Sequence, residues 1–261
     1  MKNKKKIIIL TFLIVLLIFV NYNFFNKNLE NFFLESETGI VERVIDGDTV
    51  VLSTEEHVRL LGINSPERGE EFYQEAKEFL ESLVLNKTVK IVFGKEKKDK
   101  YNRVLAYIFL ENINVNLKLV EKGFANYYFP SGKDSYYSSF EESWEECINE
   151  NNNLCEHSTN YCSECIELKN LDVKNQEIIF QNKCIFNCDL TSWNIKDEGR
   201  KNFVFPEFTL QKESEVKIIV EEGSNSKETL FWTGENYVLT DTGDTIFLRD
   251  KENKLVLWQS Y

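Results

Sequence analysis

Two aspartates separated by one glycine stand in the stretch VIDGDTVVLS, residues 44–53. In an extended strand, the side chains of Asp46 and Asp48 would point to the same face, where two like charges repel each other and need a cation between them. Asp-Gly between apolar runs is also a strong hairpin-turn signal. Taken by itself the stretch favours a turn, and a metal site is the alternative.

The chemistry that this chain can offer is restricted to carboxylates and arginines. It contains only two histidines, so histidine triads and histidine-rich metal sites have little to draw on. The net charge of −12 does not suggest a nucleic-acid partner. However, residues 87–103, KTVKIVFGKEKKDKYNR, carry seven basic and two acidic side chains. This stretch is either a solvated loop between strands or a local patch that attracts phosphate.

Regular elements surround these polar residues. Alternating or β-branched runs predict strands at 38–45, 49–53, 57–63, 88–93 and 103–109, and helices are predicted at 70–84, 114–123 and 135–150. In the first helix, apolar residues recur with a period of 3.6 on one face. Five strands with an inserted helix fit a small closed β-barrel of the oligonucleotide-binding (OB) type, an α+β fold.

The character of the chain changes after Asn153. Short β-rich runs at hairpin-like spacing follow, among them QEIIFQN, EVKIIVE and DTIFLRD, and they predict an all-β sandwich. We therefore expect a multidomain chain with an N-terminal segment at 1–37, the barrel domain at 38–155 and the sandwich at 156–261.

The N-terminal segment predicts a membrane partner. Four lysines precede an apolar run from Ile7 to Val20 that only Thr11 interrupts, and more aromatic residues follow it. Because no small-residue cleavage site follows, we expect an uncleaved signal anchor, a transmembrane helix with both later domains outside the cytoplasm. A cleaved signal peptide and a secreted protein are the alternative.

All six cysteines lie in the second half of the chain, from Cys147 to Cys188. An even number in an oxidising compartment predicts disulfides. The alternative is a zinc site of four thiolates, which would pair Cys162 and Cys165 with Cys184 and Cys188.

Three motifs in order, VIDGDTV, RLLGINSPE and DKYNRVLAY, resemble the staphylococcal nuclease (thermonuclease) family over residues 38 to about 150. The resemblance implies an OB-type barrel and a calcium-dependent phosphodiesterase acting on DNA, RNA or both. It implies these roles: Asp48 as a direct calcium ligand, Asp46 as a ligand acting through water, Asn64 at the place of a second direct aspartate, Ser65 as a carbonyl ligand, Glu67 as general base, Arg59 and Arg103 as phosphate-binding arginines, Lys100 and Tyr101 as substrate contacts, and Thr49 as their support.

These roles agree with the chemistry of phosphodiester hydrolysis. Negative charge on the phosphoryl oxygens is stabilised by cations, and calcium prefers oxygen ligands. Two features depart from the family pattern. Asn64 removes one negative charge from the metal site, which predicts weaker calcium binding or tolerance of other ions. The segment between Glu67 and the helix is also short, where the family usually has a longer mobile loop.

The second domain resembles the lamin-tail domain, an immunoglobulin-like sandwich, through DLTSWNIKDEG, FVFPEFTL, LFWTG and DTGDTIFLRDKENKLV, over about residues 165–261. This resemblance implies targeting or substrate holding, through nucleic acid, an envelope or another protein, and no catalytic residue. The rival interpretation of the whole chain is a non-catalytic, membrane-anchored scaffold that binds nucleic acid or protein. Scaffolds of this fold typically lose the residues found here at positions 46, 48, 59, 67 and 103, so the sequence favours a nuclease.

Overall fold

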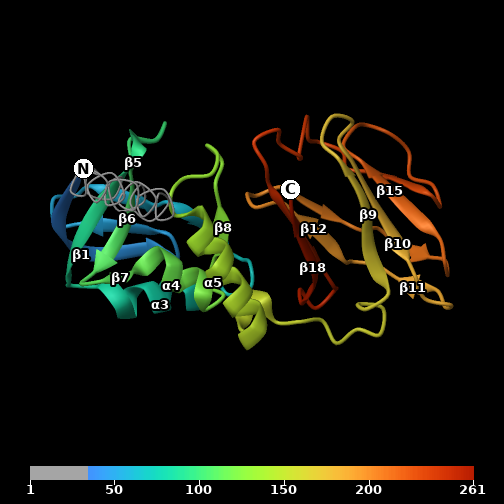
Figure 1. Ribbon diagram of the computed structural model, residues 1–261, viewed down its shortest axis with the longest axis horizontal. Coiled ribbons are helices and arrows are strands. Elements are labelled where there is room, and N and C mark those ends of the chain that lie inside the picture. The colour runs from blue at the N-terminus through green and yellow to red at the C-terminus, as the bar shows by residue number, and fades with distance from the viewer. Residues whose placement is uncertain (1–34) are drawn as a thin grey trace, which may run out of the picture.

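Five strands close into a barrel in the first half of the chain. The computed structural model describes residues 35–261, and Figure 1 shows the barrel beside a second, all-β body. The barrel strands are β1 (Ser36–Asp46), β2 (Thr49–Leu52), β3 (His57–Leu60), β5 (Thr88–Lys98) and β6 (Val104–Leu110). They follow the order β3-β2-β1-β5-β6, and a parallel pairing of β3 with β6 closes the ring. The predicted OB-type barrel is confirmed.

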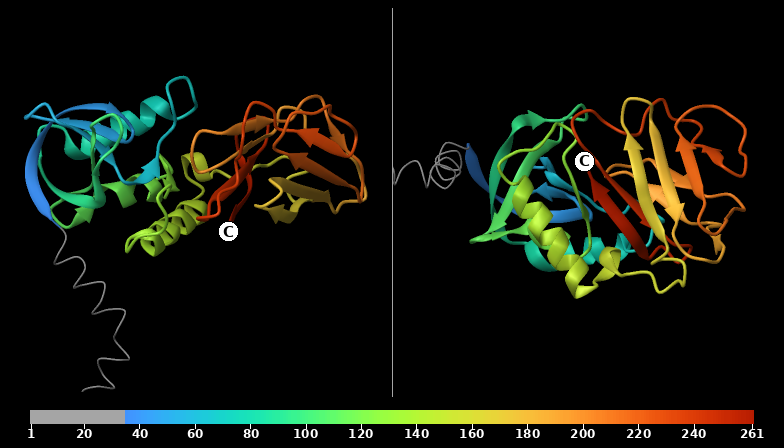
Figure 2. Two further views of the ribbon diagram at one scale, coloured as in Figure 1. Left: turned by 90° about the horizontal axis from the view of Figure 1, so that it is seen from above. Right: turned by 45° about the vertical axis from the view of Figure 1, so that its right-hand side comes forward.

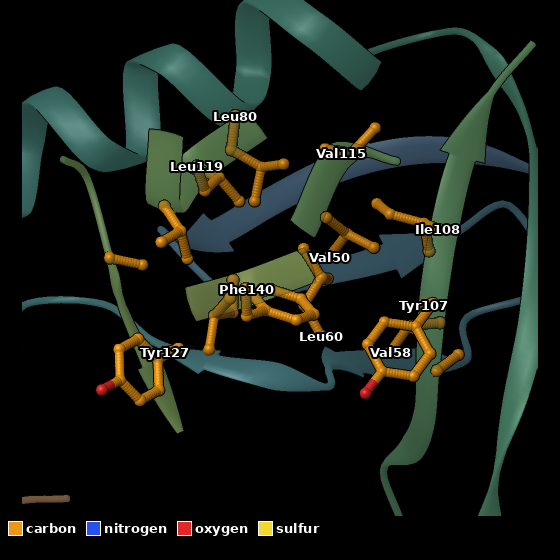
Figure 3. Packing of buried hydrophobic residues seen from close by; sticks show 14 of the residues in the cluster. Val50, Val58, Leu60, Leu80, Tyr107, Ile108, Val115, Leu119, Tyr127 and Phe140 are labelled. Carbon is orange, nitrogen blue, oxygen red and sulfur yellow. The ribbon is translucent and has the colours of Figure 1, made fainter. Parts of the chain in front are cut away.

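Short elements cover the barrel and extend it toward the second body. They are β7 (Ile113–Asn114), β4 (Gly62–Asn64), β8 (Asn126–Tyr128), α3 (Tyr73–Val84), α4 (Val115–Glu121), α5 (Tyr137–Glu150) and the 3-10 turn η1 (Asn153–Cys155). Apolar side chains from the strands and from all three helices meet in one core, as Figure 3 shows for Val50, Leu80 and Leu119. Helix α3 begins three residues later than predicted, because Phe72 has a left-handed backbone with φ of 65°.

The predicted strand 57–63 is broken in two. Gly62 has φ of +74°, and a Cβ at this position would lie 2.8 Å from the ring of Phe140. Glycine is therefore required by both the backbone and the close packing. The break lets the chain leave the barrel after β3, so that β4 pairs with β8. It also carries Asn64 and the residues after it to the edge of the barrel.

The second half consists of β-sheets. Its strands are β9 (Ile166–Asp172), β10 (Glu177–Asn182), β11 (Cys188–Asp189), β12 (Asn194–Lys196), β13 (Asn202–Val204), β14 (Thr209–Leu210), β15 (Glu215–Ile219), β16 (Thr229–Phe231), β17 (Thr245–Arg249) and β18 (Leu255–Ser260). Two four-stranded sheets, β16-β15-β10-β9 and β13-β12-β17-β18, enclose one apolar core. The β-rich character is confirmed. The lamin-tail relationship and the domain boundaries stay predictions.

All six cysteines form disulfides. Cys147 bonds Cys155 and joins α5 to η1, whereas Cys162 bonds Cys188 and Cys165 bonds Cys184 in the second body. The four cysteines of the alternative zinc site are therefore bonded to one another. This arrangement agrees with the disulfide interpretation.

The two bodies share a packed interface. The ring of Trp144 on α5 packs edge-on against Phe247 on β17, with 5.3 Å between ring centroids. Phe247 and Leu255 belong to the barrel's own core, although they come from the C-terminal strands. Both views in Figure 2 show these strands, in red, beside α5. Because apolar packing of this kind resists sliding, we treat the interface as part of the fold.

Within residues 35–261, no helix has both the length and the apolar character needed to cross a bilayer. The predicted transmembrane helix lies outside the described residues.

Candidate active site

The paired aspartates lie at a two-residue hairpin turn. Asp46 is the last residue of β1 and pairs with Thr49, while Gly47 and Asp48 form the turn itself. The hairpin turn that the sequence favours is therefore confirmed, in place of the extended strand that would put both carboxylates on one face. The turn still brings the two together, because the backbone N–H of Asp48 donates to Asp46 Oδ1 at 3.1 Å. A turn of this kind is typical of aspartate.

Glycine is required inside this turn for space. A Cβ at Gly47 would lie 2.7 Å from Cβ of Ser65 and 2.8 Å from Cβ of Ala76. Contacts under 3 Å are not tolerated, so any larger residue would push the turn away from helix α3 and from Ser65. The motif therefore packs the aspartate turn directly against the other half of the site.

Asp48 is the buried centre of the site. Its Oδ2 accepts hydrogen bonds from the backbone N–H and the hydroxyl of Ser65, both at 3.0 Å, and Oδ1 accepts from the hydroxyl of Thr49 at 3.1 Å. The guanidinium of Arg59 lies 3.0 Å from the same Oδ2. Both side chains of this ion pair are about one-tenth exposed, at 8% for Asp48 and 11% for Arg59. The arginine is therefore held in place by its partner.

Among residues 35–261, no basic side chain forms an ion pair with Asp46. Burial, followed by the neighbouring charge of Asp48, raises its pKa to about 6. Two carboxylates held together against their mutual repulsion are the electrostatic condition that a bound cation relieves.

Asn64 lies between this centre and the second body. Its Oδ1 faces the guanidinium of Arg59 at 3.5 Å. Its Nδ2 donates to two backbone carbonyls of the second body, those of Gly199 at 2.8 Å and Glu198 at 3.3 Å. The amide thus joins the aspartate centre to a loop more than 130 residues further along the chain.

Glu67 stands on the exposed rim. It follows Ser65 in the loop before α3, and its backbone N–H donates to Glu70 Oε2 at 2.7 Å. Its carboxylate lies 2.6 Å from the guanidinium of Arg200, in an ion pair in which both side chains are largely exposed, at 47% and 71%. The predicted base is therefore open to solvent on one side and touches the second body on the other.

Arg103, Lys100 and Tyr101 form a second group at the hairpin between β5 and β6. The Nε of Arg103 binds Asp99 at 2.7 Å, and its guanidinium lies 5.5 Å from the centroid of the exposed Tyr101 ring. The ammonium of Lys100 lies 5.1 Å from the same centroid. None of the hydrogen bonds or ion pairs found among residues 35–261 joins this group to the carboxylate centre.

The hairpin group nevertheless lies close to Arg59, at the seam where β3 pairs with β6 and closes the barrel. The parallel pairing of β3 with β6 places Val58 opposite Val104, so that Arg59 and Arg103 flank one strand pair. Arg103 and Tyr101 line a surface cleft together with His57 and Lys98. An elongated, negatively charged ligand could therefore contact both arginines along this seam.

The oxygen donors of the centre fit a hard divalent cation in chemical type. Asp46, Asp48, the amide oxygen of Asn64 and the carbonyl of Ser65 are all oxygen ligands, as calcium prefers. The burial of two adjacent carboxylates supports the same fit. Within the described residues, no group of three or more His, Cys, Asp or Glu side chains is arranged to hold a metal. Because Asn64 is neutral, the four proposed oxygen ligands include two carboxylates, one fewer than with an aspartate at position 64.

Sequence reasoning missed the contribution of the second body. The stretch KDEGRKN, residues 196–202, reads as an ordinary polar turn between strands, and it contributes Arg200 and two carbonyls to the site. No pattern in the sequence connects this turn with Glu67 or Asn64, because the contact depends on how the two bodies dock.

A closed OB-type barrel with carboxylates and arginines gathered at one edge offers groups that can hold a cation and a phosphate. The family model for staphylococcal nuclease homologues matches residues 57–156. The thermonuclease of Staphylococcus intermedius is 32% identical over 162 residues, covering 58% of this chain and 95% of that protein. The chain belongs to the staphylococcal nuclease family.

Other relatives carry related names. An uncharacterized endonuclease of Haemophilus influenzae is 34% identical over 112 residues, 41% of this chain and 62% of that protein. Endonuclease YhcR of Bacillus subtilis is 32% identical over 123 residues, 40% of this chain and 10% of that protein. These relationships support a nuclease.

Proposed function

We propose that this protein is a calcium-dependent nuclease that hydrolyses phosphodiester bonds of DNA, RNA or both. The observation that carries the proposal is the gathering of Asp46, Asp48, Arg59 and Glu67 at one edge of the barrel. Scaffolds of this fold typically lose these residues, so their presence together supports a nuclease over a scaffold that only binds.

Each of these residues has a different role in phosphodiester cleavage. Arg59 is held in place by Asp48 and can donate its remaining N–H groups to a phosphate. The guanidinium of Arg103, next to the pairing of β3 with β6, can bind a second phosphate. Glu67, on the open rim, accepts a proton from the attacking water. A calcium ion bound to the oxygen donors would stabilise the negative charge that develops on the phosphoryl oxygens.

We place the activity outside the cytoplasm, on a chain anchored through its N-terminal segment. Three disulfides among residues 35–261 support an oxidising compartment. Lys100 and Tyr101 would contact the nucleic acid beyond the cleaved bond. The second body would act as a lamin-tail-like domain that binds or targets.

The test is cleavage of single-stranded DNA, duplex DNA and RNA by the full-length chain, with calcium and with excess chelator. We expect cleavage only with calcium. Glu67→Gln should lower turnover by roughly 10²- to 10⁴-fold, the usual contribution of a general base, while oligonucleotide affinity stays within about twofold. Glu75→Gln, an exposed carboxylate on α3, is the control of equal charge change.

Undiminished cleavage in chelator would remove calcium from the proposal. If Glu67→Gln keeps the wild-type turnover, Glu67 is not the base. Tight nucleic-acid binding by the wild type without any cleavage would establish the scaffold alternative instead.

A further inference from the structure

The loop between β12 and β13 spans residues 197–201, and its first four residues, called here the 197–200 loop, reach from the second body into the site. β12 lies on the side of the sandwich that faces the barrel (Figure 1). The loop touches the site at two points. The carbonyls of Glu198 and Gly199 accept from Asn64, and the guanidinium of Arg200 meets the carboxylate of Glu67.

This loop is anchored rather than free. The carboxylate of Glu198 is buried and accepts hydrogen bonds from the hydroxyl of Thr245 at 2.7 Å and from the backbone N–H of Phe129 at 3.1 Å. Its carbonyl also accepts from Asn126 Nδ2 at 2.9 Å. Because the loop is bonded to both bodies, the backbone that carries Arg200 is held in a fixed position, and a fixed position favours binding of a substrate.

Further contacts hold the segment that carries Glu67. The ammonium of Lys196 lies 2.9 Å from Glu70 Oε1, and Asn253 Nδ2 donates to Glu71 Oε2 at 3.1 Å. The short segment before α3 is therefore tied to the second body at Glu67, Glu70 and Glu71. The second body thus holds the base-bearing segment in addition to touching the base.

The residue type at position 64 matches this arrangement. An amide can donate to two carbonyl oxygens, whereas a carboxylate at the same place would meet them with a negative charge. The departure from the family's aspartate is thereby explained by the loop that lies against it.

We propose that the 197–200 loop is part of the nuclease site, an inference that rests on the proposed nuclease function. In it, Arg200 is a substrate-binding residue. Its guanidinium leaves the carboxylate of Glu67 and binds a phosphate of the nucleic acid instead. In the free protein one guanidinium nitrogen of Arg200 contacts Glu67 and most of the side chain faces solvent. Exposed ion pairs contribute little stability, so a phosphate that accepts a two-pronged contact can replace this one.

The exchange would serve the reaction in two ways. The phosphate backbone gains a positively charged partner beside the site. The carboxylate of Glu67 loses its contact with the guanidinium and becomes free to face the attacking water. Substrate binding and release of the base are thus linked through one side chain.

Arg200→Ala in the full-length chain tests this assignment. Lys201→Ala is the matched control, because it removes the same charge from the neighbouring residue, whose ammonium binds the carbonyl of Tyr237 and lies 3.6 Å from the centroid of the Tyr237 ring. Affinity for a short single-stranded oligonucleotide is measured in calcium, in the Glu67→Gln background where the substrate is not consumed. KM and kcat are measured with Glu67 intact.

We expect Arg200→Ala to weaken oligonucleotide binding and raise KM by about 3- to 10-fold, with kcat unchanged. The slope of log affinity against log salt should become shallower by about 0.7, the share of one phosphate contact on a single strand. Arg200→Lys should restore part of the affinity, and Lys201→Ala should match the parent protein in all three quantities.

Wild-type affinity, salt slope and KM in Arg200→Ala would overturn the assignment while leaving the nuclease intact. A kcat/KM that rises in Arg200→Ala would also overturn it, and would make the loop an inhibitory contact. Failure of the wild type itself to cleave or bind nucleic acid would instead remove the proposed function, and this inference with it.

Discussion

The carboxylates of Asp48 and Glu67 each bind an arginine, at 3.0 and 2.6 Å, but the two pairs differ in burial and in origin. The pair of Asp48 with Arg59 is buried and lies within the barrel. The pair of Glu67 with Arg200 is exposed and connects the two bodies. A buried pair positions its members permanently, whereas an exposed pair can open when a competing anion arrives.

The largest expected effect comes from breaking the buried pair. Arg59→Ala leaves Asp48 and Asp46 side by side without a cation, and losing one partner of a buried pair costs about 3 kcal/mol or more. We expect the free energy of unfolding, measured by urea denaturation in chelator, to fall by roughly that amount, with activity lost. Calcium should restore part of the stability, because it binds the folded state.

Arg200→Ala and Arg43→Ala are the comparisons for that measurement. Arg43 pairs with Glu55 at 3.5 Å on the surface, with side chains that are 52% and 75% exposed. Exposed pairs contribute at most about 1 kcal/mol, so both variants should stay close to the wild type. Equal losses in all three variants would mean that burial does not distinguish the two ion pairs of the site.

Asn64→Asp acts on the residue that joins the two pairs. The new carboxylate would face the carbonyls of Glu198 and Gly199 without a hydrogen to donate, which costs about 1–3 kcal/mol. The same charge should strengthen the attraction for calcium. We therefore expect a lower free energy of unfolding in chelator, together with a lower calcium concentration for half-maximal cleavage.

Asn64→Ser is the companion variant, because it removes the amide without adding charge. It should lose the interface bonds and gain no calcium affinity. Weaker or unchanged calcium affinity in a folded Asn64→Asp protein would show that position 64 is not a ligand, and the metal site drawn around Asp46 and Asp48 would have to exclude it.

The sequence predicted the barrel and the position of the aspartate turn because their determinants are local. Alternating apolar residues specify β1 to β3, and the Asp-Gly turn lies where its signal indicated. The break at Gly62 escaped prediction, because a glycine inside an apolar run does not reveal a left-handed backbone. Arg200 escaped it for a different reason, since its role depends on docking between bodies. The roles predicted for the site residues all stay predictions, namely those of Asp46, Asp48, Arg59, Asn64, Ser65, Glu67, Lys100, Tyr101 and Arg103.

The smallest expected effect concerns the anchor of the loop, and it depends on pH. Burial, with the nearby charges of Asp244 and Asp197, raises the pKa of Glu198 to about 8 from an ordinary 4.5. The folded state therefore favours the protonated carboxyl. The contribution of Glu198 to the free energy of unfolding is therefore fully present below about pH 4.5, and it is lost as the pH rises through about 8. Wild-type stability should fall over this window.

Glu198→Gln should flatten that fall. The amide is neutral at every pH and fits the same place, since its oxygen can accept from the N–H of Phe129 while its NH2 donates to the hydroxyl of Thr245. We expect a melting temperature close to the wild type near pH 5 and several degrees higher near pH 8.

Asp197 and Asp244, whose pKa values burial also raises, keep part of the pH dependence of stability in this variant. Glu221→Gln, on the exposed surface of the same body, should leave the wild-type slope unchanged. A Glu198→Gln protein whose melting temperature falls with pH as steeply as the wild type would show that Glu198 is ionised in the fold, held by its two donors alone.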